Sequence, residues 1–180
     1  MNGSGANAFS YLVGTLLDLY IATVLFRLLL QWVRADFYNP VCQFLVKVTN
    51  PAVVPLRRVI PSIGKLDTAS VLLILALEFF SVWVASRISS SPLAPEQIIM
   101  FSLMKLAATL LMTYFFLIIA AVILSWIGAQ MRHPVIPLVY QLTEPVLAPF
   151  RKIIPPIAGI DLSPLFALIT IRFLLLLIGW

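Results

Sequence analysis

Four long apolar stretches constrain the fold of this chain more than any other feature. They cover Ala8–Val33, Thr68–Ser86, Ile98–Ile127 and Leu162–Trp180. A helix of about 20 residues crosses the ~30 Å of hydrocarbon in a bilayer, so each stretch has the length of a membrane span. With 62% hydrophobic and 11% charged residues, the chain is also far more apolar than an average soluble domain. We therefore expect an all-α membrane protein with four transmembrane helices.

The chain repeats itself at an offset of 94 residues without a gap. The stretch NPAVVPLRRVIPSIGKLD at 50–67 returns as EPVLAPFRKIIPPIAGID at 144–161. Such self-similarity at a fixed period indicates tandem copies of one structural unit. We expect two copies, 1–92 and 93–180. Each would contain a spanning helix, an interfacial segment and a second spanning helix, with the interfacial segments at 40–66 and 134–160.

The distribution of basic residues predicts how the copies sit in the membrane. Each copy has an even number of spans, so the copies are parallel and both interfacial segments lie on one face. Lysines and arginines gather on that face, whereas the opposite face carries only Arg87 near its loop. By the positive-inside rule both interfacial segments are cytoplasmic and both termini lie outside. The basic residues of the cytoplasmic side are Arg34, Lys47, Arg57, Arg58, Lys65, Arg132, Arg151 and Lys152.

Each interfacial segment begins with a pattern typical of a short amphipathic helix. Apolar residues recur at helical spacing through 40–49 and 134–143. Asn39 suits an N-cap and Pro40 a first helical turn. Such a helix can lie in the interface, pack against the bundle, or do both. We expect it to end before Pro51, because proline disfavours helix in the residue before it, and only one or two helical turns to follow.

Charged side chains of these segments are candidates for binding and for capping. Four basic residues can donate to lipid phosphates or to the carboxylates of a partner, or they can act only as topology signals. Asp67 and Asp161 each stand before a predicted spanning helix and suit its N-cap. A salt link from Asp67 back to Arg57 or Arg58 is a secondary expectation. The candidate binding residues are Arg57, Arg58, Arg151 and Lys152.

Ionisable residues inside the predicted spans are costly and therefore informative. Glu78 and Arg172 occupy equivalent positions in the two copies with opposite charge. We expect them to pair, or Glu78 and Asp18 to share Arg172. The pair can fix helix register or form part of an ion or proton path. Arg27 and Lys105 lie nearer the ends of their spans, and we expect both to extend to the interface.

The sequence contains no pattern typical of an enzyme or of a cofactor site. One cysteine and one histidine cannot form a disulfide or a metal cluster on their own. The net charge of +5 is accounted for by the topology signals, so it does not indicate nucleic-acid binding. We expect no catalytic residue, no metal and no cofactor.

The repeated motif resembles that of a known family. The pattern N/E-P-x-x-x-P-x-R-[RK]-x-I-P-x-x-x-x-x-D follows a long helix ending in tryptophan in both copies, and Lys152 stands in place of the second arginine. Together with LDLY at 17–20, FRLLLQW at 26–32 and DFYNP at 36–40, it resembles the YggT (YlmG-like) family of small membrane proteins. The resemblance covers nearly the whole chain and implies a bacterial inner membrane.

The resemblance implies little about activity. Bacterial members of the family are linked to osmotic-stress tolerance and potassium uptake, and plastid relatives to complex assembly. We expect a non-enzymatic scaffold or assembly factor. Its partners would be anionic lipid head groups, and either another membrane protein or a second copy of the chain. The alternative is an ion (potassium) transport or channel-modulating protein that uses Asp18, Glu78 and Arg172.

Overall fold

The computed structural model describes residues 3–64, 66–88, 92–127, 133–155 and 161–180. Within them the chain forms six helices, and the all-α prediction is confirmed. Lys65, Arg132 and residues 156–160 of the second interfacial segment, which entered the sequence argument, lie outside the described residues. The helices are α1 (Gly3–Trp32), α2 (Pro40–Val59), α3 (Thr68–Ile88), α4 (Pro95–Ile127), α5 (Val135–Ile153) and α6 (Ser163–Leu177).

Three helices of the described chain are long and apolar enough to cross a bilayer. The qualifying segments are Tyr11–Trp32, Thr68–Ile88 and Pro95–Ile127. The fourth predicted span, at 162–180, contains the apolar helix α6 of 15 residues. At about 1.5 Å per residue it extends about 22 Å, which is shorter than the ~30 Å hydrocarbon core. The chain thus has the character of a membrane protein, with one helix shorter than predicted.

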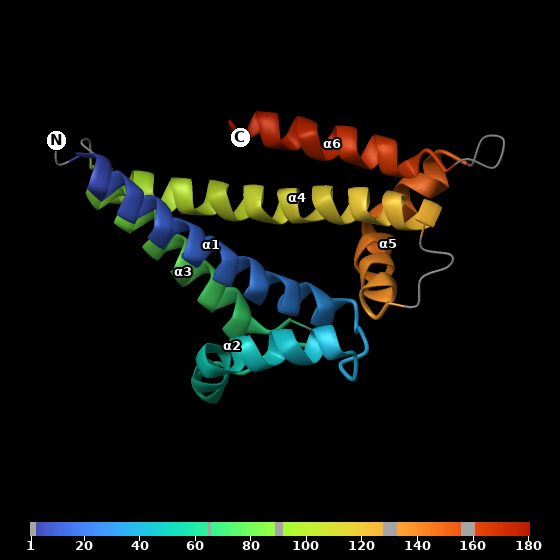
Figure 1. Cartoon of the computed structure of the whole chain (residues 1–180), viewed down its shortest axis with the longest axis horizontal. Helices are drawn as coiled ribbons and strands as arrows, with labels where there is room; N and C mark the ends of the chain where they lie inside the picture. Colours follow the sequence, from blue (N-terminus) through green and yellow to red (C-terminus); the bar gives the residue numbers. More distant parts are fainter. Residues whose placement is uncertain (1–2, 65, 89–91, 128–132, 156–160) are drawn as a thin grey trace.

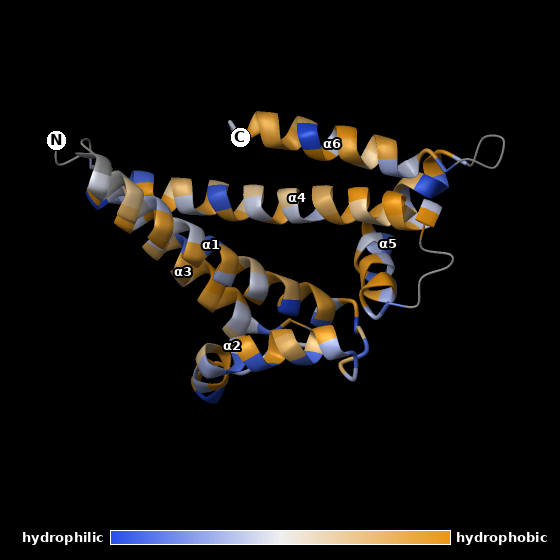
Figure 2. Cartoon of the chain, viewed as in Figure 1, coloured by the Kyte–Doolittle hydropathy of each residue, from blue (hydrophilic) through white to orange (hydrophobic). Residues whose placement is uncertain are grey.

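The helices form two units of similar order, the N-terminal unit (α1–α3) and the C-terminal unit (α4–α6). In each unit the first long helix packs against the last one, α1 on α3 and α4 on α6, while α3 also packs on α4. Figure 1 shows α3 and α6 on opposite sides of α4. The long helices are hydrophobic over most of their length, interrupted by single polar turns (Figure 2).

The prediction that the amphipathic helices end before Pro51 and its counterpart Pro145 is wrong. α2 and α5 continue through two internal prolines each, to Val59 and Ile153. Proline removes one backbone hydrogen bond and bends a helix, but it does not always end it. The second part of each helix turns away from the first in Figure 1.

Packing explains why α2 continues as a helix past its two internal prolines. Cys42, Thr49 and Val53 are buried along one side of the helix, while Pro51 and Pro55 are exposed on the other. The buried face therefore continues across the proline positions. The carbonyl groups that lose a partner lie near the exposed prolines. The free energy gained by burying that face outweighs the tendency of a residue before proline to avoid the helical conformation.

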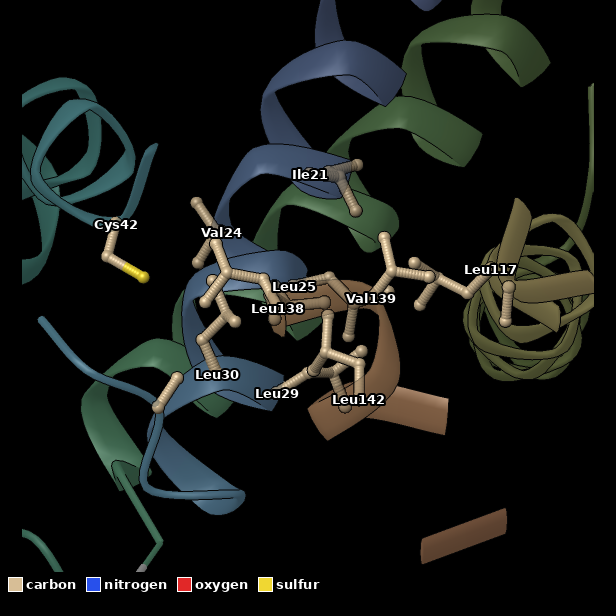
Figure 3. Packing of buried hydrophobic residues seen from close by; sticks show 13 residues of the cluster. Ile21, Val24, Leu25, Leu29, Leu30, Cys42, Leu117, Leu138, Val139 and Leu142 are labelled. Atoms are coloured by element: carbon tan, nitrogen blue, oxygen red, sulfur yellow. The ribbon is translucent and has the colours of Figure 1, made fainter. Parts of the chain in front are cut away.

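A buried hydrophobic cluster joins the two units. Leu25 and Leu29 of α1 lie beside Leu138, Val139 and Leu142 of α5 in Figure 3. The same cluster reaches α3 and α4. The amphipathic helices thus pack against the bundle, which was one of the two open alternatives for them.

Candidate functional site

The starts of the two amphipathic helices are tied together. Asn39 Oδ1 accepts from the backbone N–H of Val41 at 2.9 Å, so Asn39 caps α2 as predicted. Its Nδ2 donates to the backbone oxygen of Pro134 at 2.7 Å, just before α5. The counterpart of Asn39 is His133, whose Nδ1 accepts from the N–H of Val135 at 3.3 Å. This contact joins the start of α2 to the start of α5.

At the far end of α2 an arginine holds a fully buried aspartate. Arg57 Nη2 lies 2.6 Å from Asp67 Oδ2, and Arg57 Nε donates to Asp67 Oδ1 at 3.2 Å. The Asp67 side chain is 0% exposed and also accepts from Ser70 Oγ. Burial would raise the pKa of Asp67, but the hydrogen bonds from Arg57 and Ser70 and the Arg57 charge hold it below its ordinary value. Asp67 therefore stays ionised and links the end of α2 to the start of α3.

The C-terminal unit has a corresponding pair in a more open setting. Arg151 Nε donates to Asp161 Oδ2 at 2.8 Å, and Arg151 Nη1 donates to Glu144 Oε2 at 2.7 Å. Burial tends to raise the pKa of Asp161, yet hydrogen bonds from Ser163 and Arg151 lower it overall. The backbone N–H of Ser163 donates to Asp161 Oδ1 at 2.8 Å, but the N-cap position of α6 is Leu162, one residue after the predicted Asp161. The Asp161 side chain is 34% exposed.

The structure separates the four candidate binding residues into two classes. Arg57 and Arg151 form ion pairs with carboxylates of their own units. Arg58 and Lys152 are exposed, and in the described part of the chain neither joins an ion pair. One uncompensated basic side chain therefore remains at the end of each amphipathic helix.

The intramembrane ion cluster is built around Lys105. Lys105 Nζ lies 2.6 Å from Asp18 Oδ1 and 3.2 Å from Glu78 Oε2, and it donates to Ser81 Oγ at 2.7 Å. Thr109 Oγ1 donates to Glu78 Oε1 at 3.2 Å. Glu78 is buried, with a side chain 1% exposed. The cluster joins α1, α3 and α4.

The predicted role of Arg172 is wrong, and so is the predicted direction of Lys105. Arg172 is exposed on α6 and, among the described residues, contacts no carboxylate. The pairing was predicted because Glu78 and Arg172 lie at equivalent depths in their helices. Those helices, α3 and α6, lie on opposite sides of α4 (Figure 1), so the two side chains do not meet. Lys105 turns inward to Asp18 and Glu78 instead of extending to the interface.

Arg27 also lies elsewhere than predicted. It is 4% exposed, and its Nη1 donates to Thr49 Oγ1 at 2.6 Å and to Asn50 Oδ1 at 2.8 Å. The prediction that it extends to the interface is therefore wrong. Arg27 fastens α1 to the middle of α2, one residue before Pro51. The polar residues Thr49 and Asn50 directly before Pro51 were the feature of the sequence that could have indicated a buried hydrogen-bond partner such as Arg27.

The sequence of this chain matches a known family. A family model described as CCB3/YggT matches residues 6–88 and again residues 100–180. An "Uncharacterized protein in proC 3'region" of Vibrio alginolyticus is 43% identical over 96% of this chain and 94% of its own length. "Uncharacterized protein YggT" of Escherichia coli (strain K12) is 38% identical over 88% of this chain and 82% of its own length. No solved structure matches the chain.

Proposed function

Because the chain belongs to the CCB3/YggT family, we propose that it is a small non-enzymatic scaffold of the bacterial inner membrane. It is built from two tandem copies of a helix, interfacial helix, helix unit. The family model matches the chain in two stretches. α2 covers 40–59 and α5 covers 135–153, close to the offset of 94. Their C-caps also correspond, Ile60 at φ −117, ψ 101 and Ile154 at φ −119, ψ 93.

In this proposal α6 is the fourth span and both amphipathic helices lie at the cytoplasmic face. The N-terminus lies at one end of α1 and α2 begins at its other end, while the C-terminus lies at the end of α6 away from α5 (Figure 1). The basic residues Lys47, Arg58 and Lys152 are exposed on the α2 and α5 side. Cytoplasmic segments carry the excess of such residues, and the N-terminus and C-terminus then face the periplasm.

The scaffold role rests on one observation, the charge left exposed at the ends of α2 and α5. Since Arg57 and Arg151 are held by Asp67 and Asp161, their neighbours remain available to other molecules. Arg58 and Lys152 bind anionic lipid head groups at the inner leaflet. That leaflet attracts each such residue by about 1 kcal/mol. The same surface suits an acidic segment of a membrane-protein partner or of a second copy of the chain.

Lipid retention tests this role. We expect the purified full-length chain to retain phosphatidylglycerol in native mass spectra. The Arg58→Gln/Lys152→Gln variant should retain it about fivefold more weakly for each residue changed, the equivalent of about 1 kcal/mol each. Arg87→Gln, at the opposite side, is the matched control and should behave like the wild type. Equal retention by all three proteins, or an equal loss in the control, contradicts the proposed role.

The Lys105 cluster favours a second candidate, ion transport. One cation between two carboxylates inside the bilayer is the kind of site that transport paths use, and Glu78 lies in it with almost no exposure. Potassium flux in proteoliposomes tests this function. Flux that disappears in Glu78→Gln supports transport through this cluster, and absence of flux in the wild type contradicts it.

A further inference from the structure

A pocket is lined by residues of α4, α5 and the start of α6; these three helices meet at the right of Figure 1. Its volume is about 420 Å³, within the range of small-molecule sites. Ala121 forms part of its wall, and the Arg151 and Asp161 pair lines its polar side. Trp126 and Tyr140 supply aromatic surface. We name this cavity the C-terminal pocket.

The corresponding place in the N-terminal unit is filled by polar side chains of the chain itself. There an arginine donates to Thr49 and Asn50, a glutamine accepts from Arg57, and a serine donates to Asp67. At the offset of 94 residues, each is replaced by a side chain that is shorter or has no donor. The replacements are Arg27 by Ala121, Gln31 by Ser125 and Ser70 by Pro164.

The loss of these side chains changes the exposure of the carboxylate. Asp67 is 0% exposed, whereas Asp161 is 34% exposed and lines the pocket. Thr143, the counterpart of Thr49, donates to the backbone oxygen of Val139 at 2.9 Å much as Thr49 donates to that of Leu45. In the N-terminal unit Arg27 donates to that threonine, and no described side chain does so for Thr143.

The net charge around the C-terminal pocket differs by two elementary charges from the net charge at the corresponding position of the N-terminal unit. In the N-terminal unit Arg57 donates to Asp67 and Arg27 donates to the neutral amide Asn50, so two arginines and one aspartate give a net charge of +1. In the C-terminal unit Arg151 faces both Asp161 and Glu144, which gives −1. Glu144 replaces the amide Asn50 and lies 2.7 Å from Arg151, which lines the pocket, so a cation in the place of Arg27 would have a carboxylate nearby where Arg27 has an amide. Charge-assisted hydrogen bonds of this kind are the stronger ones.

We propose that the C-terminal pocket binds an organic cation, a primary ammonium or guanidinium group on a short apolar stem. The ligand takes the position that Arg27 holds in the N-terminal unit. Ala121 and Leu147 contact its stem, and Tyr140 and Trp126 offer aromatic faces to its charge. Two sources carry this chemistry, the ethanolamine head group of a phospholipid and a free cytoplasmic amine. The site is separate from Arg58 and Lys152 and does not depend on the proposed scaffold function.

Titration calorimetry of the full-length chain in a neutral detergent tests the proposal. Butylguanidinium represents the soluble cation, and dihexanoyl phosphatidylethanolamine the lipid. Butylurea is the neutral control of nearly the same shape as butylguanidinium. We expect butylguanidinium to bind at least about tenfold more tightly than butylurea, since one charge-assisted hydrogen bond accounts for that ratio.

Two variants locate the binding. Ala121→Arg supplies an internal guanidinium, as Arg27 does, and should weaken binding of the cationic probes at least about tenfold. Glu144→Gln removes the partner charge at an exposed position, and it decides the question alone if Ala121→Arg does not yield folded protein. Binding by only one cationic probe supports the proposal and identifies the source. The proposal is overturned if neither probe binds, if butylurea binds equally well, or if the variants bind like the wild type.

Discussion

Replacing Arg57 by alanine will destabilise the chain far more than replacing Arg151, although the two arginines hold corresponding positions. The reason lies in their partners. Asp67 is 0% exposed, so Arg57→Ala leaves a buried carboxylate that keeps Ser70 as its side-chain hydrogen-bond donor but has lost its ion-pair partner. Asp161 and Glu144 are 34% and 58% exposed, so water can solvate both when Arg151 is removed.

The difference can be expressed as free energy. Breaking a buried ion pair by removing one partner costs about 3–5 kcal/mol. Since the Arg57 side chain is 37% exposed, we expect the lower end, about 3 kcal/mol. An exposed pair contributes about 0–1 kcal/mol, so the two pairs of Arg151 limit the cost of Arg151→Ala to about 2 kcal/mol. At about 2–4 °C per kcal/mol for a chain of this size, the melting temperature falls by about 6–12 °C in Arg57→Ala and by at most about 8 °C in Arg151→Ala.

Thermal unfolding in a mild detergent, followed by circular dichroism at one fixed scan rate, measures both variants against the wild type. Arg57→Ala/Asp67→Ala supplies the control for the mechanism. Because it removes the stranded charge as well, it should melt above Arg57→Ala. The reasoning is refuted if Arg57→Ala and Arg151→Ala lower the melting temperature equally, or if the double variant melts below Arg57→Ala.

Three further predictions follow from the other polar contacts. Arg27→Ala should cost about 1.5–3 kcal/mol, because a charged donor to Thr49 and Asn50 is lost; denaturant titration measures it, and an unchanged midpoint contradicts it. Lys105→Met should lower the melting temperature by leaving Glu78 buried without its cation, and adding Glu78→Gln should restore part of the loss. The lowered pKa of Asp67 adds stability that is fully present above its ordinary value of 3.8 and is lost as pH falls through the lower folded value. Melting temperatures below pH 3.8 should therefore fall in the wild type more than in Arg57→Ala, and parallel curves would oppose this origin.

Features set by local pattern were predictable from the sequence. The apolar stretches gave α1, α3 and α4 to within a few residues, because long hydrophobic runs have few alternatives in a bilayer. Asn39 as a cap followed from the residue type before Pro40. The link between Arg57 and Asp67 was a secondary expectation and is a principal contact of the site.

Features set by helix arrangement were not predictable. Glu78 and Arg172 share a depth, but depth says nothing about which side of α4 each helix occupies. The inward direction of Lys105 depends on Asp18 and Glu78 meeting it from two other helices. The continuation of α2 through Pro51 depends on tertiary burial, which local proline preferences do not contain.

The account depends most on α2 and α5 lying at the same, cytoplasmic face of the membrane. Cysteine accessibility measures this directly, with Arg58→Cys and Lys152→Cys placed one at a time in a Cys42→Ser background. Cys42 is buried, so its replacement leaves the exposed surface unchanged. Both cysteines should resist a membrane-impermeant maleimide in spheroplasts and react with it in inverted vesicles. Labelling of the two positions from opposite sides, or of both from outside, would contradict the account.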